Sequence, residues 1–122
     1  MIVFDSSALL AFVQDEPGGS AVEEGLLAGA GVCGAANWSE TAQKVRTRGA
    51  DWPLIRALLL GYGLVVEPVT ADDAERAAAG WESGSGLSLG DRLCLALAER
   101  LDVPAWTADR AWRGRPRAVL IR

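Results

Sequence analysis

The chain has 122 residues, half of them apolar, and a formal net charge of −4. This length allows one folded domain with a buried core, so we expect residues 1–122 to form a single domain. The negative charge argues against a protein that coats nucleic acid generally, because such proteins neutralise phosphates with basic surfaces. No apolar run approaches the roughly 20 residues that cross a bilayer, and an acid stands at position 5, where a signal peptide would be basic. We therefore expect a cytoplasmic protein with no membrane contact.

The chain contains no histidine, which excludes Ser-His-Asp and Cys-His catalysis and the usual mixed zinc sites. Cys33 and Cys94 lack the CxxC spacing of a zinc or redox centre, and we interpret both as small buried hydrophobic residues. Any catalysis must therefore depend on carboxylates, together with a hard cation that oxygen ligands suit.

The predicted elements of the first half alternate between strands and helices. They are a strand over 2–5, helices over 8–14 and 20–27, a strand over 31–36, and helices over 37–48 and 52–60. We expect Asn37 to be the N-cap of the helix over 37–48, and Pro53 to lie in the first turn of the next helix.

The second half continues the alternation. It contains a strand over 64–69, a helix from Thr70 to about 81, a flexible connection over 83–90, a helix over 88–101, and strands over 105–107 and 118–121. Leu93, Leu97 and Leu101 are predicted to form the core stripe of the helix over 88–101. This alternation favours a parallel sheet covered on both faces, in which groups beyond the carboxyl ends of the strands converge on one crevice.

Four acids fall at boundaries of these elements. Asp5 ends the first strand and Asp109 follows the strand over 105–107, while Glu40 and Asp91 lie in the first turns of two helices. A parallel α/β fold brings such boundaries toward one end of the sheet. Clustered carboxylates repel one another unless a cation intervenes, so a cluster indicates a metal site.

Each acid also has a purely structural interpretation that the sequence leaves open. Asp91 forms a capping-box pattern with Ser88, Glu40 lies near a helix N-terminus, and Asp109 fits an Asx turn. Asp5 is the hardest to explain in this way, because an acid that ends a buried apolar strand is costly without a partner.

Basic residues gather in two stretches. The first is Lys44, Arg46 and Arg48; the second follows Asp109, after which there is no acid, and comprises Arg110, Arg113, Arg115, Arg117 and Arg122. Such strips suit a phosphodiester backbone although the whole chain is acidic. A solvated arginine-rich surface explains the composition equally well.

Three segments resemble the hallmark segments of PIN-domain ribonucleases, and within that family most resemble VapC toxins. They are IVFDSSALLAFVQDEPG, NWSE and LSLGDRLCLALAERLDVPAWTADRAW, which stand in the family's order and span residues 2–112. The resemblance implies an α/β fold, a PIN-like three-layer αβα sandwich with a central, mostly parallel sheet of four to five strands. It also implies a Mg²⁺-dependent endoribonuclease that is the toxin of a type II toxin–antitoxin system.

The resemblance further implies that Asp5, Glu40, Asp91 and Asp109 surround one or two Mg²⁺ or Mn²⁺ ions. We expect Asp5 and Asp91 to be direct ligands. Glu40 and Asp109 then hold water molecules of the ion, or a second ion that binds with substrate.

Other residues follow by position in the same segments. Ser6 and Thr107 stand where a hydroxyl residue commonly supports the acids. Arg92, Arg110 and Arg113 are candidates for contacts to RNA phosphates, with a structural salt bridge as an equal alternative for each.

The expected partners are RNA, a cognate VapB-type antitoxin that blocks the acidic cleft, and a second copy of the chain in a homodimer. Trp38, Trp52 and Trp112 are candidates for the groove that receives the antitoxin, with a core position as the alternative. A rival function is a PIN-like module that has lost catalysis and only binds RNA or protein. A phospho-receiver domain is disfavoured, because Asp5 is followed by serines and Lys44 is the only lysine.

Overall fold

The computed structural model describes all 122 residues, and a five-stranded sheet with the order β3-β2-β1-β4-β5 lies at its centre. The strands are β1 (Ile2–Phe4), β2 (Gly31–Gly34), β3 (Val65–Glu67), β4 (Ala105–Thr107) and β5 (Ala118–Leu120). All four pairings are parallel, which confirms the predicted sheet.

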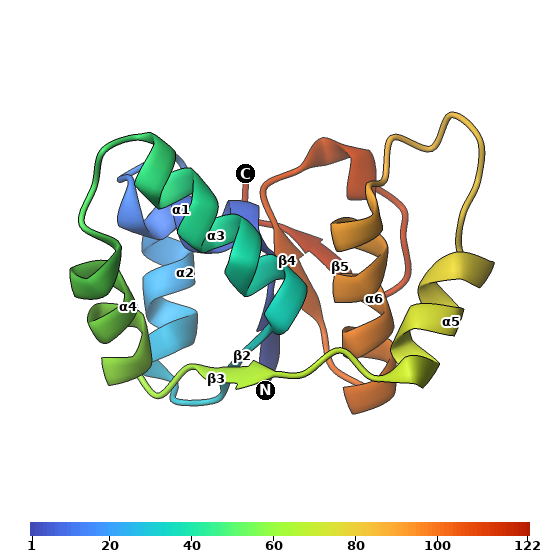
Figure 1. The fold of residues 1–122 in the computed structure, drawn as a ribbon, viewed down its shortest axis with the longest axis horizontal. Helices are drawn as coiled ribbons and strands as arrows, with labels where there is room; N and C mark the ends of the chain where they lie inside the picture. Colours follow the sequence, from blue (N-terminus) through green and yellow to red (C-terminus); the bar gives the residue numbers. More distant parts are fainter.

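Helices cover both faces of the sheet (Figure 1). They are α1 (Ser6–Val13), α2 (Gly19–Leu27), α3 (Ala35–Thr47), α4 (Trp52–Gly61), α5 (Ala71–Ala79), α6 (Leu89–Leu101) and the short 3₁₀ helix η1 (Arg110–Trp112). Side chains alternate along β1, where Phe4 packs with α1, α2 and α4, whereas Val3 packs on the opposite face with α6 and η1. The two faces therefore form two separate cores, as a three-layer sandwich requires.

The order of the strands determines where a site can form. The chain leaves β1 toward β2 on one side and returns to β4 on the other, so the direction of winding reverses between β1 and β4. Ligand sites in open parallel sheets lie outside the carboxyl ends of the strands at such a switch point. Asp5 directly follows β1, and Asp109 follows β4 at this place.

Two local predictions were wrong. Gly34, not Asn37, is the N-cap of α3, so Asn37 lies inside the first turn with a buried side chain, and Glu40 lies beyond the first turn and not within it. The stripe predicted on α6 is confirmed at Leu97, which is buried, and at Leu101, which packs against the core, while Leu93 is half-buried. The remaining buried residues of α6 are Cys94, Ala96 and Ala98.

The tryptophans proposed for a groove are mainly core residues. Trp112 is fully buried and Trp52 is 7% exposed, with the ring of Trp52 in edge-to-face contact with that of Trp38. The core interpretation is confirmed for Trp52 and Trp112, as it is for the two free cysteines, which are both buried, whereas Trp38 is half-buried. No helix in the structure combines the length and apolar character needed to span a membrane.

Candidate active site

Asp5 is a buried carboxylate at the end of β1, and two hydroxyl groups bind one of its oxygens. Ser7 Oγ donates to Asp5 Oδ2 at 2.6 Å and Thr107 Oγ1 donates to the same oxygen at 2.9 Å. The two hydroxyl oxygens also accept backbone N–H groups, Ser7 from Ala108 and Thr107 from Asp109. The ends of β1 and β4 are thereby tied together around Asp5.

Asn37 connects Asp5 to Glu40 and to the start of α6. Its Nδ2 lies 3.1 Å from Glu40 Oε1, 3.2 Å from the Gly90 carbonyl and 3.4 Å from Asp5 Oδ1. The Oδ1 of Asn37 is buried without a hydrogen-bond partner, which costs free energy of folding. The hydrogen bonds that Nδ2 donates must offset this cost. Asn37 therefore holds Glu40 near Asp5.

Gly90 allows this approach because it has no side chain. A Cβ atom at position 90 would lie 2.5 Å from Glu40 Oε1 and 3.0 Å from Glu40 Cδ. Real Cβ atoms do not come this close to a neighbour, so Glu40 could not occupy its present place against alanine.

Asp91 and Asp109 each cap a helix. Asp91 Oδ2 accepts the Ser88 N–H at 2.9 Å in a reciprocal capping box, and Asp109 Oδ1 accepts the Ala111 N–H at 2.9 Å at the start of η1. These structural interpretations, anticipated from the sequence, are confirmed. They do not remove the acids from the site, because each cap uses a single oxygen.

The four carboxylates share one pattern. One oxygen of each accepts a hydrogen bond from the protein, and the other accepts only a long hydrogen bond or none. Asp91 Oδ1, Asp109 Oδ2 and Glu40 Oε2 accept no hydrogen bond, and Asp5 Oδ1 accepts only the long one from Asn37. Oriented carboxylates with one remaining oxygen are suited to bind a cation or water.

Electrostatics show which acids are close. Burial raises the pKa of Asp5, the hydroxyls of Ser7 and Thr107 lower it, and the Asp91 charge raises it further. Burial and the charges of Asp5 and Asp91 raise the pKa of Glu40 against the lowering effect of Asn37 and Lys44. Asp5, Glu40 and Asp91 therefore form one repelling group. Asp109 reaches this group only through its backbone N–H, which donates to the Thr107 hydroxyl, and its carboxylate has no effect on the pKa of Asp5 or Glu40.

A family model described as the PIN domain matches residues 2–117. The chain belongs to the PIN domain family. The family resemblance predicted from the three sequence segments is thereby confirmed.

Solved structures share the fold of this PIN domain. A toxin–antitoxin complex from Klebsiella pneumoniae superposes with a TM-score of 0.79 at 19% identity, covering 100% of this chain and 98% of that one. VapC20 of Mycobacterium tuberculosis, described as a toxin that cleaves the sarcin–ricin loop, gives a TM-score of 0.72 at 19% identity, covering 90% and 91%. No curated protein sequence matches the chain.

The donor set of the PIN domain fits a hard divalent cation, although no three acidic side chains lie close enough together to hold one by themselves. The available ligands are carboxylate oxygens, with no nitrogen or thiolate, since burial and nearby acids raise the pKa of Cys33 and keep it protonated. Mg²⁺ is commonly bound by one or two carboxylates, with water and substrate phosphate completing its coordination. The observed arrangement matches that requirement.

The sequence identified the hydroxyl at Thr107 but not the one at position 7. Ser6 contributes its backbone N–H, which lowers the pKa of Asp5, and its hydroxyl forms no hydrogen bond. Ser7, one residue further along α1, points back at Asp5. Asn37 and Gly90 were also missed as site residues; the NWSE segment contains Asn37, but its contacts depend on α6, over 50 residues away.

The candidate phosphate-binding arginines lie in two different places. Arg110 and Arg113 are exposed around η1 and form no ion pair, so the alternative of a structural salt bridge does not apply to them. Arg92 donates from Nη1 to the Ala77 carbonyl of α5 at 2.6 Å. It therefore faces α5 and not the acids.

Proposed function

We propose that this PIN domain is the toxin of a type II toxin–antitoxin pair and cuts RNA with the help of Mg²⁺ or Mn²⁺. The observation that carries the proposal is the repelling group formed by Asp5, Glu40 and Asp91, each with an oxygen directed away from its protein partner. Membership of the PIN family and the likeness to two toxin structures support it.

In this proposal Asp5 and Asp91 hold the ion, and Glu40 and Asp109 hold water or a second ion. The chemistry that the bound ion supplies is positive charge that lowers the pKa of water and stabilises the phosphoryl oxygens in the transition state. Ser7 and Thr107 fix the Asp5 carboxylate so that Oδ1 stays available. Because the chain lacks histidine, Glu40 is the group placed to accept a proton from the attacking water; its raised pKa suits that role.

A basic depression beside the acids is the proposed path of the RNA backbone. Its volume is about 420 Å³, and its lining includes Ser7 and three cations, Lys44, Arg48 and Arg122, against the single acid Glu16, which lies 4.0 Å from Arg48 and 3.8 Å from Arg122. Ser7 is bonded to Asp5, so a phosphate held by these cations lies next to the acids. Two basic stretches that are far apart in sequence meet here, and the exposed Arg110 and Arg113 add positive charge beyond Asp109.

The antitoxin is proposed to cover apolar surface as well as the acidic site. Leu54 and Leu58 lie one turn apart on α4, and their side chains are 67% and 45% exposed. Exposed leucines in register on one helix are suited to receive an amphipathic partner helix, with an arginine of the partner meeting the acids. We also propose a homodimer, which sedimentation of the purified protein would test.

The decisive experiment is a cleavage assay on total cellular RNA with Mg²⁺ or Mn²⁺, using the wild type, Asp5→Asn and Asp51→Asn. Asp51 caps α4 in the same general way but lies outside the site, so it is a matched control. We expect Asp5→Asn to abolish cleavage while the fold is retained, and Asp51→Asn to cut like the wild type. Binding of RNA without any metal-dependent cleavage by the wild type would instead favour the inactive PIN-like module.

A further inference from the structure

A second pocket lies on the far side of α6 from the acids. It has a volume of about 380 Å³, opens to solvent, and is lined mainly by α5, α6 and residues 115–117. This volume falls within the roughly 300–1,000 Å³ of ligand-binding pockets. Apolar side chains such as Leu95 and Leu87 contribute to its lining, so it offers both apolar and charged contacts.

The charged residues of this pocket are mostly arginines. Four of the chain's 12 lysines and arginines line it, against the single carboxylate of Glu99. The four are Arg76, Arg92, Arg115 and Arg117. The chain has a net charge of −4, yet one third of its cationic side chains line this one pocket. This concentration of positive charge favours an anionic ligand.

Arg92 has the least compensated charge of the four. Its Nη1 donates to the Ala77 carbonyl, but it has no carboxylate partner, and its Nε is buried without any hydrogen bond. An unpaired buried donor costs free energy that an oxygen of a ligand would recover.

The other three arginines are paired with acids that are themselves largely exposed. These pairs are Arg76 with both Asp72 and Glu99, Arg115 with Glu82, and Arg117 with Asp102. Exposed ion pairs of this kind contribute little, and one or two carboxylates leave several donors of a guanidinium free. The acids therefore orient the arginines without using up their capacity to bind an anion.

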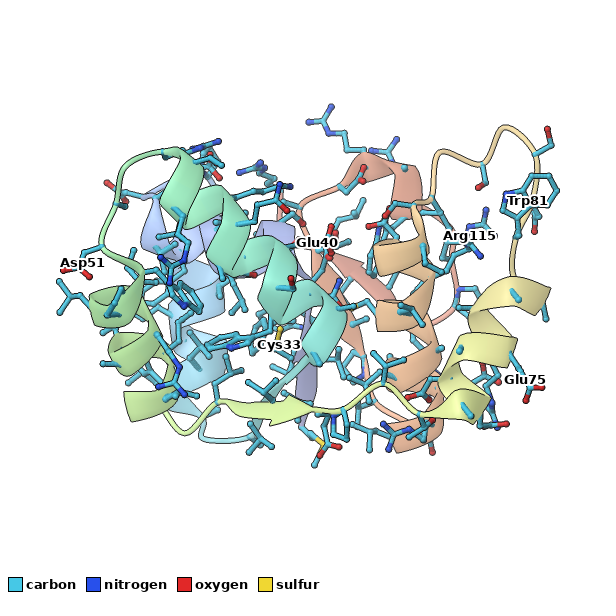
Figure 2. The ribbon with its side chains drawn as sticks, in the orientation of Figure 1. Cys33, Glu40, Asp51, Glu75, Trp81 and Arg115 are labelled. Carbon is cyan, nitrogen blue, oxygen red and sulfur yellow. The ribbon has the colours of Figure 1, made fainter.

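An exposed aromatic side chain stands beside the pocket. Trp81 follows Gly80, which lines the pocket, and it is 63% exposed, whereas the other four tryptophans are buried or half-buried. Arg115 reaches toward the loop that carries Trp81, where Nη1 lies 3.4 Å from Glu82 Oε1 (Figure 2). Cationic side chains next to an exposed indole are the combination that binds single-stranded nucleic acid, through the phosphate and the face of the base.

We propose that this pocket binds one nucleotide of a single-stranded part of the RNA substrate, with the phosphate against Arg92 and Arg115 and the base stacked on Trp81. The proposal rests on the proposed function for its choice of RNA. Asp91 and Arg92 are adjacent near the start of α6. The charge of Asp91 acts on Asp5, whereas Arg92 lines the pocket. The pocket would therefore hold RNA at a fixed offset from the point of cleavage.

The test measures binding of a short fluorescein-labelled single-stranded RNA by anisotropy, in EDTA so that no cleavage occurs. The variants are Arg115→Gln and Trp81→Leu, and the matched control is Arg56→Gln, an exposed arginine of α4 outside the pocket. We expect Trp81→Leu to weaken binding at least about fivefold, the loss that corresponds to one stacked base. Arg115→Gln is expected to weaken binding about tenfold. It should also reduce the slope of log K against the logarithm of the salt concentration by about 0.7, as for one lost phosphate contact.

Equal binding by the wild type and both pocket variants, with all proteins folded by circular dichroism, overturns the proposal. A loss of binding in Arg56→Gln as large as that in the pocket variants also overturns it. If Arg115→Gln does not fold, Arg76→Gln at the exposed rim takes its place. A wild type that binds through the pocket but never cuts RNA would refute the proposed nuclease and leave the pocket assignment standing. A wild type that cuts RNA, with pocket variants that bind RNA normally, would refute the pocket assignment and leave the proposed nuclease standing.

Discussion

Replacing Gly90 by alanine displaces Glu40 without removing its charge. The new Cβ would lie 2.5 Å from Glu40 Oε1, whereas carbon and oxygen atoms in contact are separated by about 3.5 Å, so the carboxylate must retreat by about 1 Å. Retreat breaks the 3.1 Å hydrogen bond from Asn37, at a cost of about 1 kcal/mol. Alanine in a helix stabilises by up to about 1 kcal/mol relative to glycine.

These two terms nearly cancel, so Gly90→Ala is expected to change the free energy of unfolding by no more than about 1 kcal/mol. Cleavage is expected to fall about 10- to 100-fold, which is typical when a group that supports a metal site is lost. The assay is RNA cleavage over a series of Mg²⁺ concentrations, with urea denaturation as the measure of stability.

Gly61→Ala is the matched control, because Gly61 is also a helical glycine close to a helix terminus but has open space where a Cβ would lie. It should cut RNA like the wild type. Full cleavage by a folded Gly90→Ala protein would show that the position of the Glu40 carboxylate is irrelevant to activity, and the proposed role of Glu40 would be refuted.

Three further predictions concern stability. Millimolar Mg²⁺ or Mn²⁺ should raise the melting temperature of the wild type, since a ligand of the native state alone stabilises it, and an unchanged melting temperature would argue against the metal site. Without divalent ions, the raised pKa values of Asp5 and Glu40 mean that the folded state holds protons more tightly than the unfolded state. The free energy of unfolding should therefore fall as the pH rises from the ordinary carboxyl range through the raised values, and denaturation curves of Asp5→Asn in EDTA should show a smaller fall. Arg100→Leu leaves the buried Asp73 without its ion-pair partner and should destabilise the fold by about 1–3 kcal/mol, with unchanged cleavage per folded molecule.

The sequence predicted the sheet and the positions of the acids because both depend on local signals. A short apolar strand that ends in Asp5 and a capping box at Ser88 can be recognised within a few residues, and the parallel topology then brings these boundaries to one edge. The capping roles of Asp91 and Asp109 followed from the same short patterns.

The supporting contacts could not be predicted because they join distant segments. Which of two consecutive serines faces Asp5 depends on the phase of α1 relative to β4, and the sequence interpretation chose Ser6 where the structure has Ser7. Asn37 was interpreted as a helix cap, since nothing near it in sequence shows that its amide meets Gly90. The burial of Trp112 likewise depends on how η1 packs against α6.

Three helices, α1, α3 and α6, begin at the edge of the sheet where the acids gather. The partial positive charge at the starts of α1 and α6 lies beside Asp5 and Asp91, and part of the mutual repulsion of these two acids is balanced by the backbone itself. We therefore expect the newly synthesised chain to fold before any ion binds. Its activity would then be governed by when it meets metal and partner, while its folding would be independent of both.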